Sequence, residues 1–215
     1  MSLIAELFGL TDANSNFLYL SDGGHFENLG IYELVRRRCK LIVAIDASED
    51  EKSNFDDLGD SIRKCYTDFG IPIDINVNQI RADGPNKLSE SHYAIGKIHY
   101  EYADVGGAQG ILLYIKASLS GNEPADILNY AKREPSFPNQ STADQWFDES
   151  QFETYRKLGH HIASAMFGEF NGNGDADVNC KDRTKRMIEA LQRKLVRDPP
   201  PELNSEPTPN TDQPK

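Results

Sequence analysis

Cysteine is scarce in this chain, and its spacing matches no metal site. The sequence contains three cysteines, Cys39, Cys65 and Cys180, among 215 residues. An odd number of cysteines with no metal-type spacing is typical of structural thiols in a reducing compartment. We therefore expect a cytoplasmic protein, and the sequence predicts neither a metal nor another cofactor.

Positive charge is also in short supply. The chain has 23 lysines and arginines against 34 aspartates and glutamates, a formal net charge of -11 at pH 7. Nucleic acid requires a basic surface, so we predict no nucleic-acid partner. The same charge disfavours attraction of this segment to anionic lipid. Residues 46–60 carry seven acidic side chains against Lys52 alone, and we expect a solvated acidic face there; a calcium site is the less favoured alternative.

Long apolar runs are missing as well. No run approaches the roughly 20 residues needed to cross a bilayer, so no transmembrane segment is predicted. Residues 1–8 have no basic region and no cleavage site, and we expect no signal peptide. Any membrane association would come from a part of the parent protein outside this chain.

The most informative stretch that is present is residues 21–30, SDGGHFENLG. Residues 17–20 before it form a short apolar run typical of a buried strand. Residues 31–38 after it have the spacing of a helix with one buried stripe. Asp22 therefore follows the carboxyl end of a strand, where open α/β sheets bind ligands. Gly23 and Gly24 can take positive φ and let a substrate or a second loop approach. The alternative is that Asp-Gly-Gly is only a turn.

Three segments together resemble one family. Residues 22–34, DGGHFENLGIYEL, resemble the carboxyl-terminal active-site segment of bacterial patatin-like phospholipases, relatives of plant patatin and cytosolic phospholipase A. Residues 40–50, KLIVAIDASED, resemble the strand and acidic loop that follow in that family. Residues 137–149, FPNQSTADQWFDE, resemble a segment that recurs in its bacterial members. The resemblance covers residues 17–165.

The resemblance implies acyl ester hydrolysis by a serine–aspartate dyad. Asp22 would be the base that removes the proton of the serine during its attack. Gly23, Gly24 and His25 would support Asp22 or contact a lipid or acyl ester substrate, and no cofactor is implied. A lone loop histidine such as His25 can equally form only local hydrogen bonds.

The serine elbow and oxyanion loop of such a dyad are not found among the residues that precede Asp22 in this sequence. In the family, the serine lies in an upstream G-x-S-x-G elbow, and the glycine-rich oxyanion loop lies further upstream. The nearest imitation, residues 59–63, reads GDSIR, lacks the second glycine and falls in a predicted helix. We therefore expect the chain to be the carboxyl-terminal part of a larger phospholipase. Its partner would be the upstream sequence that carries the serine, and the isolated chain would be inactive.

The other candidates for chemistry are weaker. Asp46 lies at the carboxyl end of a second predicted strand and could share a crevice with Asp22. Glu27 and Asn28 are predicted to cap the start of the helix that follows them.

Two further patterns resemble metal sites only in part. His160 and His161 are adjacent on a predicted helix, so they face different directions and cannot share a metal. Residues 171–177, NGNGDAD, resemble the start of a calcium loop, but the sixth position is Ala176 and the twelfth is Asp182, where that loop needs glycine and glutamate.

Periodicity along the chain predicts an α/β fold: a mostly parallel sheet flanked by helices, with an antiparallel hairpin at one edge. An incomplete patatin-like domain would span residues 1–198, followed by a disordered proline-rich tail at 199–215. The first strand, helix and second strand would form a right-handed βαβ unit, and the last two strands the hairpin. Strands are expected at 17–20, 41–47, 73–80, 93–102 and 111–117, and helices at 31–39, 55–69, 126–133, 151–167 and 182–197.

The leading functional prediction is the aspartate-bearing segment of a patatin-like lipid acyl hydrolase. The alternative is a non-catalytic binding module that kept this part of the fold and lost the serine. A third hypothesis, a phosphate or metal hydrolase using Asp22 and Asp46 with a divalent ion, ranks last because nothing nearby is spaced to complete that site.

Overall fold

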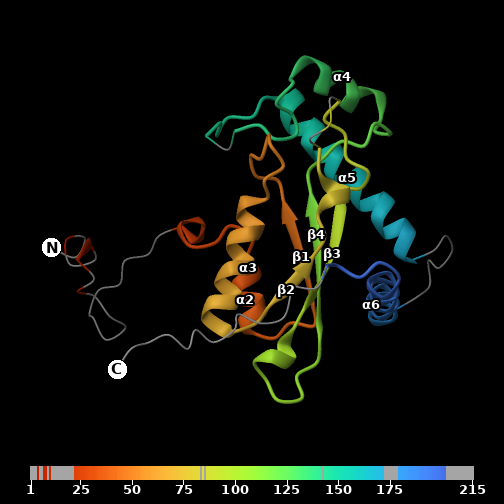
Figure 1. Cartoon of the computed structure of the whole chain (residues 1–215). Helices are drawn as coiled ribbons and strands as arrows, with labels where there is room; N and C mark the ends of the chain where they lie inside the picture. Colours follow the sequence, from red (N-terminus) through yellow and green to blue (C-terminus); the bar gives the residue numbers. More distant parts are fainter. Residues whose placement is uncertain are drawn as a thin grey trace.

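A computed structural model of the chain describes residues 22–201, apart from 83, 85, 142 and 172–178, together with residues 4, 7, 8 and 10. The described strands form one four-stranded sheet with helices on both faces (Figure 1). Helices α2 (Ile31–Arg36) and α3 (Asp56–Phe69) belong to one face, and α4 (Ala125–Arg133), α5 (Glu149–Asn171) and α6 (Cys180–Arg197) belong to the other. None of the described helices is both long and apolar enough to span a membrane.

The sheet is mixed, with the strand order β1-β4-β3-β2. Strand β1 (Leu41–Asp46) runs parallel to β4 (Gly110–Lys116), whereas β3 (Tyr93–Ile98) is antiparallel to both β4 and β2 (Ile73–Ile75). The predicted α/β fold is confirmed, but the prediction of a mostly parallel sheet is wrong. Between β2 and β3 and between β3 and β4 the chain returns without a crossover helix, and such short connections join antiparallel strands.

The predicted hairpin is confirmed, but its predicted position at one edge of the sheet is wrong. Strands β3 and β4 pair antiparallel, and β4 lies between β3 and β1. The reason is visible in β4 itself, because every one of its residues is buried. A strand that is apolar on both faces is stable only in the interior of a sheet that is covered on both sides.

Strand β4 divides its side chains between two cores. Leu112 and Tyr114 pack with α2 and α3 on one face, and Ile111, Leu113 and Ile115 pack with α4, α5 and α6 on the other. The alternation follows from the two-residue period of a strand.

Most helix predictions are confirmed. Helix α3 ends at Gly70, which takes a left-handed conformation with φ of 67°, as expected for a glycine that closes a helix. In α5 the buried stripe includes Leu158, Ile162 and Met166, but Phe152 is 61% exposed. Its predicted burial is wrong because the stripe begins at the buried Gln151 one position earlier.

Several predictions fall differently or outside the described part. The strand expected at 73–80 ends at Ile75, and a short 3-10 helix, η2 (Asn78–Ile80), follows. The strand at 17–20, the partial calcium loop at 171–177 apart from the end of α5, and the tail beyond residue 201 lie outside the described residues. The βαβ unit is therefore seen only from its helix onward.

One face of β1 is left uncovered. Val43 is 40% exposed and Ile45 is 72% exposed, although their register partners on β4, Leu113 and Ile115, are buried. Within the described part of the chain, β1 pairs with β4 alone. As far as the described residues show, this edge of the sheet is open and lies beside exposed apolar side chains, the kind of surface that favours addition of another segment.

The paired positions Ile115 and Ile45 offer a matched test of the fold. Because Ile115 is 8% exposed inside a core, Ile115→Ala should lower the free energy of unfolding by about 2–5 kcal/mol. Ile45→Ala, the same change on the 72% exposed partner, should cost less than about 0.5 kcal/mol. Urea unfolding of both variants measures this, and equal losses would contradict the arrangement of the two faces.

Candidate functional site

Asp22 lies on the surface, where it begins a single turn. It caps the 3-10 helix η1 (Gly23–His25), and its Oδ1 accepts a hydrogen bond of 3.0 Å from the backbone N–H of Gly24. Asp22, Gly23, Gly24 and His25 are all exposed. The local turn expected from Asp-Gly-Gly is therefore present, and it holds the carboxylate where a group from outside can approach it.

The two glycines act differently from the prediction. Neither adopts a positive φ, so that expectation is wrong. Gly24 instead provides space, since a Cβ there would lie 2.6 Å from Oδ1 of Asn28. The Asn28 side chain packs against Gly24, and its amide N–H donates to Asp57 Oδ1 of α3 at 3.0 Å. Close approach of a second group is thus the feature that Gly24 permits.

Helix α3 braces this loop through further contacts. Glu27 Oε1 accepts from the backbone N–H of Leu29 at 2.8 Å and from the hydroxyl of Ser61 at 2.6 Å. Lys64 donates to the carbonyl of Phe26 and lies 4.5 Å from the centre of its ring. The loop that carries Asp22 is therefore tied to a long helix rather than left as a free turn.

These contacts also decide two predictions about helix caps and one about the serine. Neither Glu27 nor Asn28 caps α2, so both predictions are wrong: Gly30 holds the N-cap position, and no side chain caps it. Glu27 bonds the backbone N–H of Leu29, which precedes the helix, and the Asn28 amide contacts α3. Ser61 of the GDSIR sequence lies inside α3, as predicted, fully buried and bonded to Glu27 and to the carbonyl of Asp57.

Asp46 is a structural carboxylate. It is 2% exposed and accepts hydrogen bonds from the N–H of Ser48 at 2.8 Å, from the Ser48 hydroxyl at 2.6 Å and from the Tyr114 hydroxyl. Lys116 Nζ lies 3.1 Å from its Oδ1. Burial by itself would raise the pKa of Asp46, but the hydrogen bonds from Ser48 and Tyr114 and the charge of Lys116 outweigh it and hold the pKa below its usual value.

Asp46 was predicted to share a crevice with Asp22, but none of its contacts within the described part of the chain is with Asp22. The contacts of Asp46 stay within the sheet and the loop that follows β1. No group of described residues able to hold a metal ion contains either aspartate. The hypothesis of a hydrolase using both aspartates and a divalent ion therefore finds no site in this part of the chain.

Two cavities lie between α6 and β3, and Asp22 lines neither of them. One, of about 510 Å³, is bordered by Tyr93, Glu169 and Lys194. The other, of about 580 Å³, is bordered by His99, whose ring nitrogens lie 2.7 Å from Asp74 Oδ2 and 2.9 Å from Glu101 Oε1. Asp22 itself lies on an exposed turn.

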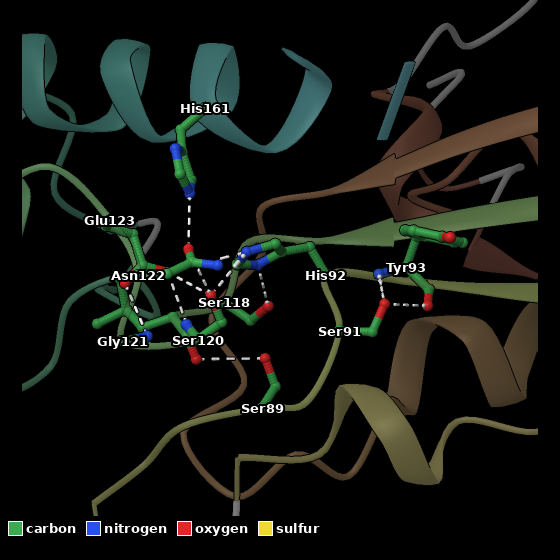
Figure 2. Close-up of polar contacts among 11 residues, drawn as sticks. Ser89, Ser91, His92, Tyr93, Ser118, Ser120, Gly121, Asn122, Glu123 and His161 are labelled. Atoms are coloured by element: carbon green, nitrogen blue, oxygen red, sulfur yellow. Dashed lines mark hydrogen bonds and ion pairs between the residues drawn. The ribbon is translucent and has the colours of Figure 1, made fainter. Parts of the chain in front are cut away.

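A second polar cluster was missed by reasoning from sequence. Figure 2 shows His92, which precedes β3, facing residues of the segment after β4, while His161 approaches from α5. His92 is 8% and Glu123 4% exposed. The available signal in the sequence was His161, but its neighbour His160 suggested only a shared metal, which the spacing excludes.

The two buried groups of this cluster, His92 and Glu123, differ in charge state at neutral pH. Burial lowers the pKa of His92 and favours the neutral ring. Burial would raise the pKa of Glu123, but the backbone N–H groups of Ser120 and Gly121 outweigh it and lower the pKa. The cluster therefore combines a carboxylate and a neutral imidazole at neutral pH.

The buried pair of Asp46 and Lys116 predicts a stability effect that depends on pH. Asp46→Asn leaves the Lys116 charge buried without a partner and should lower the free energy of unfolding at pH 7 by about 3–5 kcal/mol. Because the pKa of Asp46 is lowered in the folded protein, its contribution is complete above about pH 4 and disappears as the pH falls further.

Urea unfolding at pH 7 and at about pH 2 would measure this, with the deficit of the variant shrinking in acid. Glu51→Gln, an exposed change in the loop after β1, is the control and should have little effect at either pH. A variant as stable as the native chain at pH 7 would show that Asp46 does not stabilise this end of the sheet.

Comparison with known proteins found no protein family, no curated protein and no solved structure that matches the chain. What is established is an α/β chain with a mixed sheet, an exposed aspartate on a braced turn and a buried polar cluster at the other face.

Proposed function

We propose that this chain supplies the aspartate of a serine–aspartate acyl hydrolase of the patatin-like type. Asp22 is its general base, the substrate is a lipid or another acyl ester, and the nucleophilic serine comes from sequence outside the described residues. The observation that carries the proposal is the exposed Asp22 carboxylate at the head of a turn that a long helix holds in place.

The bracing of the turn supports this role. A general base has to sit within about 2.6–3.2 Å of the hydroxyl that it deprotonates, so its position needs support from a second layer of contacts. Here Asn28, Glu27 and Phe26 connect the turn to Asp57, Ser61 and Lys64 of α3. A turn that only reverses the chain does not need three side-chain contacts to one helix.

The uncovered edge of β1 supports the need for another segment. Val43 and Ile45 expose apolar side chains on a strand that, within the described part, has a neighbour on one side only. A segment that carries the serine would gain stability by covering these side chains.

The proposed reaction proceeds in two balanced steps. As the serine Oγ attacks the ester carbonyl, Asp22 takes the hydroxyl proton, and that proton then passes to the departing alcohol. A water molecule next attacks the acyl-serine while Asp22 accepts its proton, which returns to the serine as the carboxylic acid leaves. The N–H groups that stabilise the oxyanion would belong to the segment that brings the serine.

The second candidate function is a non-catalytic binding module. The open edge of β1 favours it, because this surface needs a partner but no chemistry. The buried Ser61 favours it too, since its hydroxyl is engaged by Glu27 and cannot serve as a nucleophile where it stands. The two functions differ in whether Asp22 matters once the partner segment is bound.

Hydrolysis of a short-chain nitrophenyl ester would test the enzyme. We expect no turnover by the isolated chain and turnover when the chain is extended by, or mixed with, the sequence encoded upstream of it. In the active form, Asp22→Asn should lower kcat by about 10²–10⁴-fold, because a base is lost while asparagine still caps the turn.

Asp126→Asn is the matched control, since Asp126 is an exposed carboxylate on α4 that pairs with Lys157 of α5 and has no contact with the turn. It should leave kcat unchanged. Full turnover by Asp22→Asn would refute the role of Asp22. Turnover by the isolated chain would show that the serine lies within it, and binding of the upstream segment without any turnover would favour the binding module.

A further inference from the structure

The cluster around His92 joins three parts of the fold that are far apart in sequence. His92 immediately precedes β3, Glu123 lies between β4 and α4, and His161 is on α5 (Figure 2). The antiparallel pairing of β3 with β4 brings the first two together, because the start of one strand lies beside the end of the other. Helix α5 covers this end of the sheet and adds the third.

His92 and His161 each offer a ring nitrogen, and Glu123 offers a carboxylate oxygen, as possible metal ligands. Their ligand atoms all lie within 4.8 Å of one another, and His92 Nε2 is 3.8 Å from Glu123 Oε1. The two imidazole rings have centres 6.1 Å apart and stand nearly perpendicular, at 84°. Ligands of a tetrahedral zinc ion lie about 3.3 Å apart, since each bond is about 2.0–2.1 Å long. A modest contraction therefore closes the site.

The surroundings of His92 match those of a metal ligand. Its Nδ1 forms a 3.0 Å hydrogen bond with the hydroxyl of Ser118, while Nε2 faces Glu123. Ligating histidines are oriented in this way, with one nitrogen bonded to a second group and the other directed at the ion. The Glu123 carboxylate is likewise fixed, by the N–H groups of Ser120 at 2.6 Å and Gly121 at 2.9 Å.

The hydroxyl of Ser120 lies within hydrogen-bond distance of three acceptors: His92 Nε2 at 3.2 Å, Asn122 Oδ1 at 2.9 Å and Glu123 Oε1 at 3.1 Å. Asn122 Oδ1 also bonds His161 at 2.9 Å, and Glu123 Oε1 accepts from the backbone N–H of Ser120 at 2.6 Å. A cation beside Nε2 and Oε1 would replace the Ser120 hydroxyl as the partner of His92 Nε2.

We propose that His92, Glu123 and His161 bind one divalent transition-metal ion, for which zinc is the best fit. Two imidazoles and one carboxylate are ligands that suit zinc and not calcium or magnesium, which prefer oxygen. His161 is the mobile member, because it must exchange its 2.9 Å hydrogen bond with Asn122 for the ion. The ion ties α5 to the ends of β3 and β4, and three protein ligands leave a fourth position for water.

His161 and His160 provide a matched pair of variants. Both lie on α5, but His160 faces Ser164 and is not part of the cluster. In calorimetric titration of the whole chain, stripped of metal by a chelator, we expect one zinc ion per chain for the native protein and for His160→Ala. His161→Ala should weaken zinc binding by more than about 100-fold, and Ser118→Ala, which loses only the support of His92, by about 10-fold.

Zinc should also raise the unfolding temperature of the native chain and of His160→Ala, but not that of His161→Ala, while magnesium and calcium should leave it unchanged. His161→Ala is a change on a partly exposed helical position, so its fold is checked by circular dichroism before titration. Absence of zinc binding by the native chain would overturn the proposal and leave a purely hydrogen-bonded cluster. Equal affinity in His161→Ala would also overturn it and place zinc elsewhere, for example on cysteine. The result is independent of the esterase test.

Discussion

The burial of β4 on both faces is the constraint on which the rest of the structure depends. Leu112 and Tyr114 need α2 and α3 to cover them, and Leu113 and Ile115 need the helices of the other face. The strand must then be internal, which forces β1 and β3 to flank it. The end of β4 also carries Lys116 to Asp46 and leads into the segment that holds Glu123. Packing of one strand thus positions both polar centres at this end of the sheet.

The sequence could predict what depends on local patterns. Helical spacing identified α3 up to Gly70, and the glycines between β3 and β4 indicated a hairpin. It could not predict the strand order, because pairing direction depends on how the chain returns after Ile75 and not on the strand residues alone. Nor could it place Phe152, since a stripe shifted by one position turns the side chain outward. Local propensity defines elements, whereas tertiary packing decides which faces are buried.

The same distinction applies to the candidate sites. Asp22 could be identified because its turn, its glycines and its helix are contiguous in sequence. The cluster of His92, Glu123 and His161 could not, because it exists only once β3 and β4 are in register and α5 is packed over them. The spacing rule correctly excludes a metal shared by His160 and His161, but it carries no information about a partner from another element. A histidine that cannot share a metal with its sequence neighbour can still share one with residues of another element.

The carboxylates of this chain differ in burial and in hydrogen bonding, and these two properties determine their possible chemical roles. Asp46 and Glu123 are buried and held by several donors, which keeps them ionised and suits them to structure or to a cation. Asp22 is exposed, beside Phe26, which is itself 48% exposed. A segment that covered Phe26 and Asp22 while delivering a serine would also exclude water from the carboxylate, and electrostatic interactions are stronger where water is excluded. Docking and catalysis would then depend on the same contact.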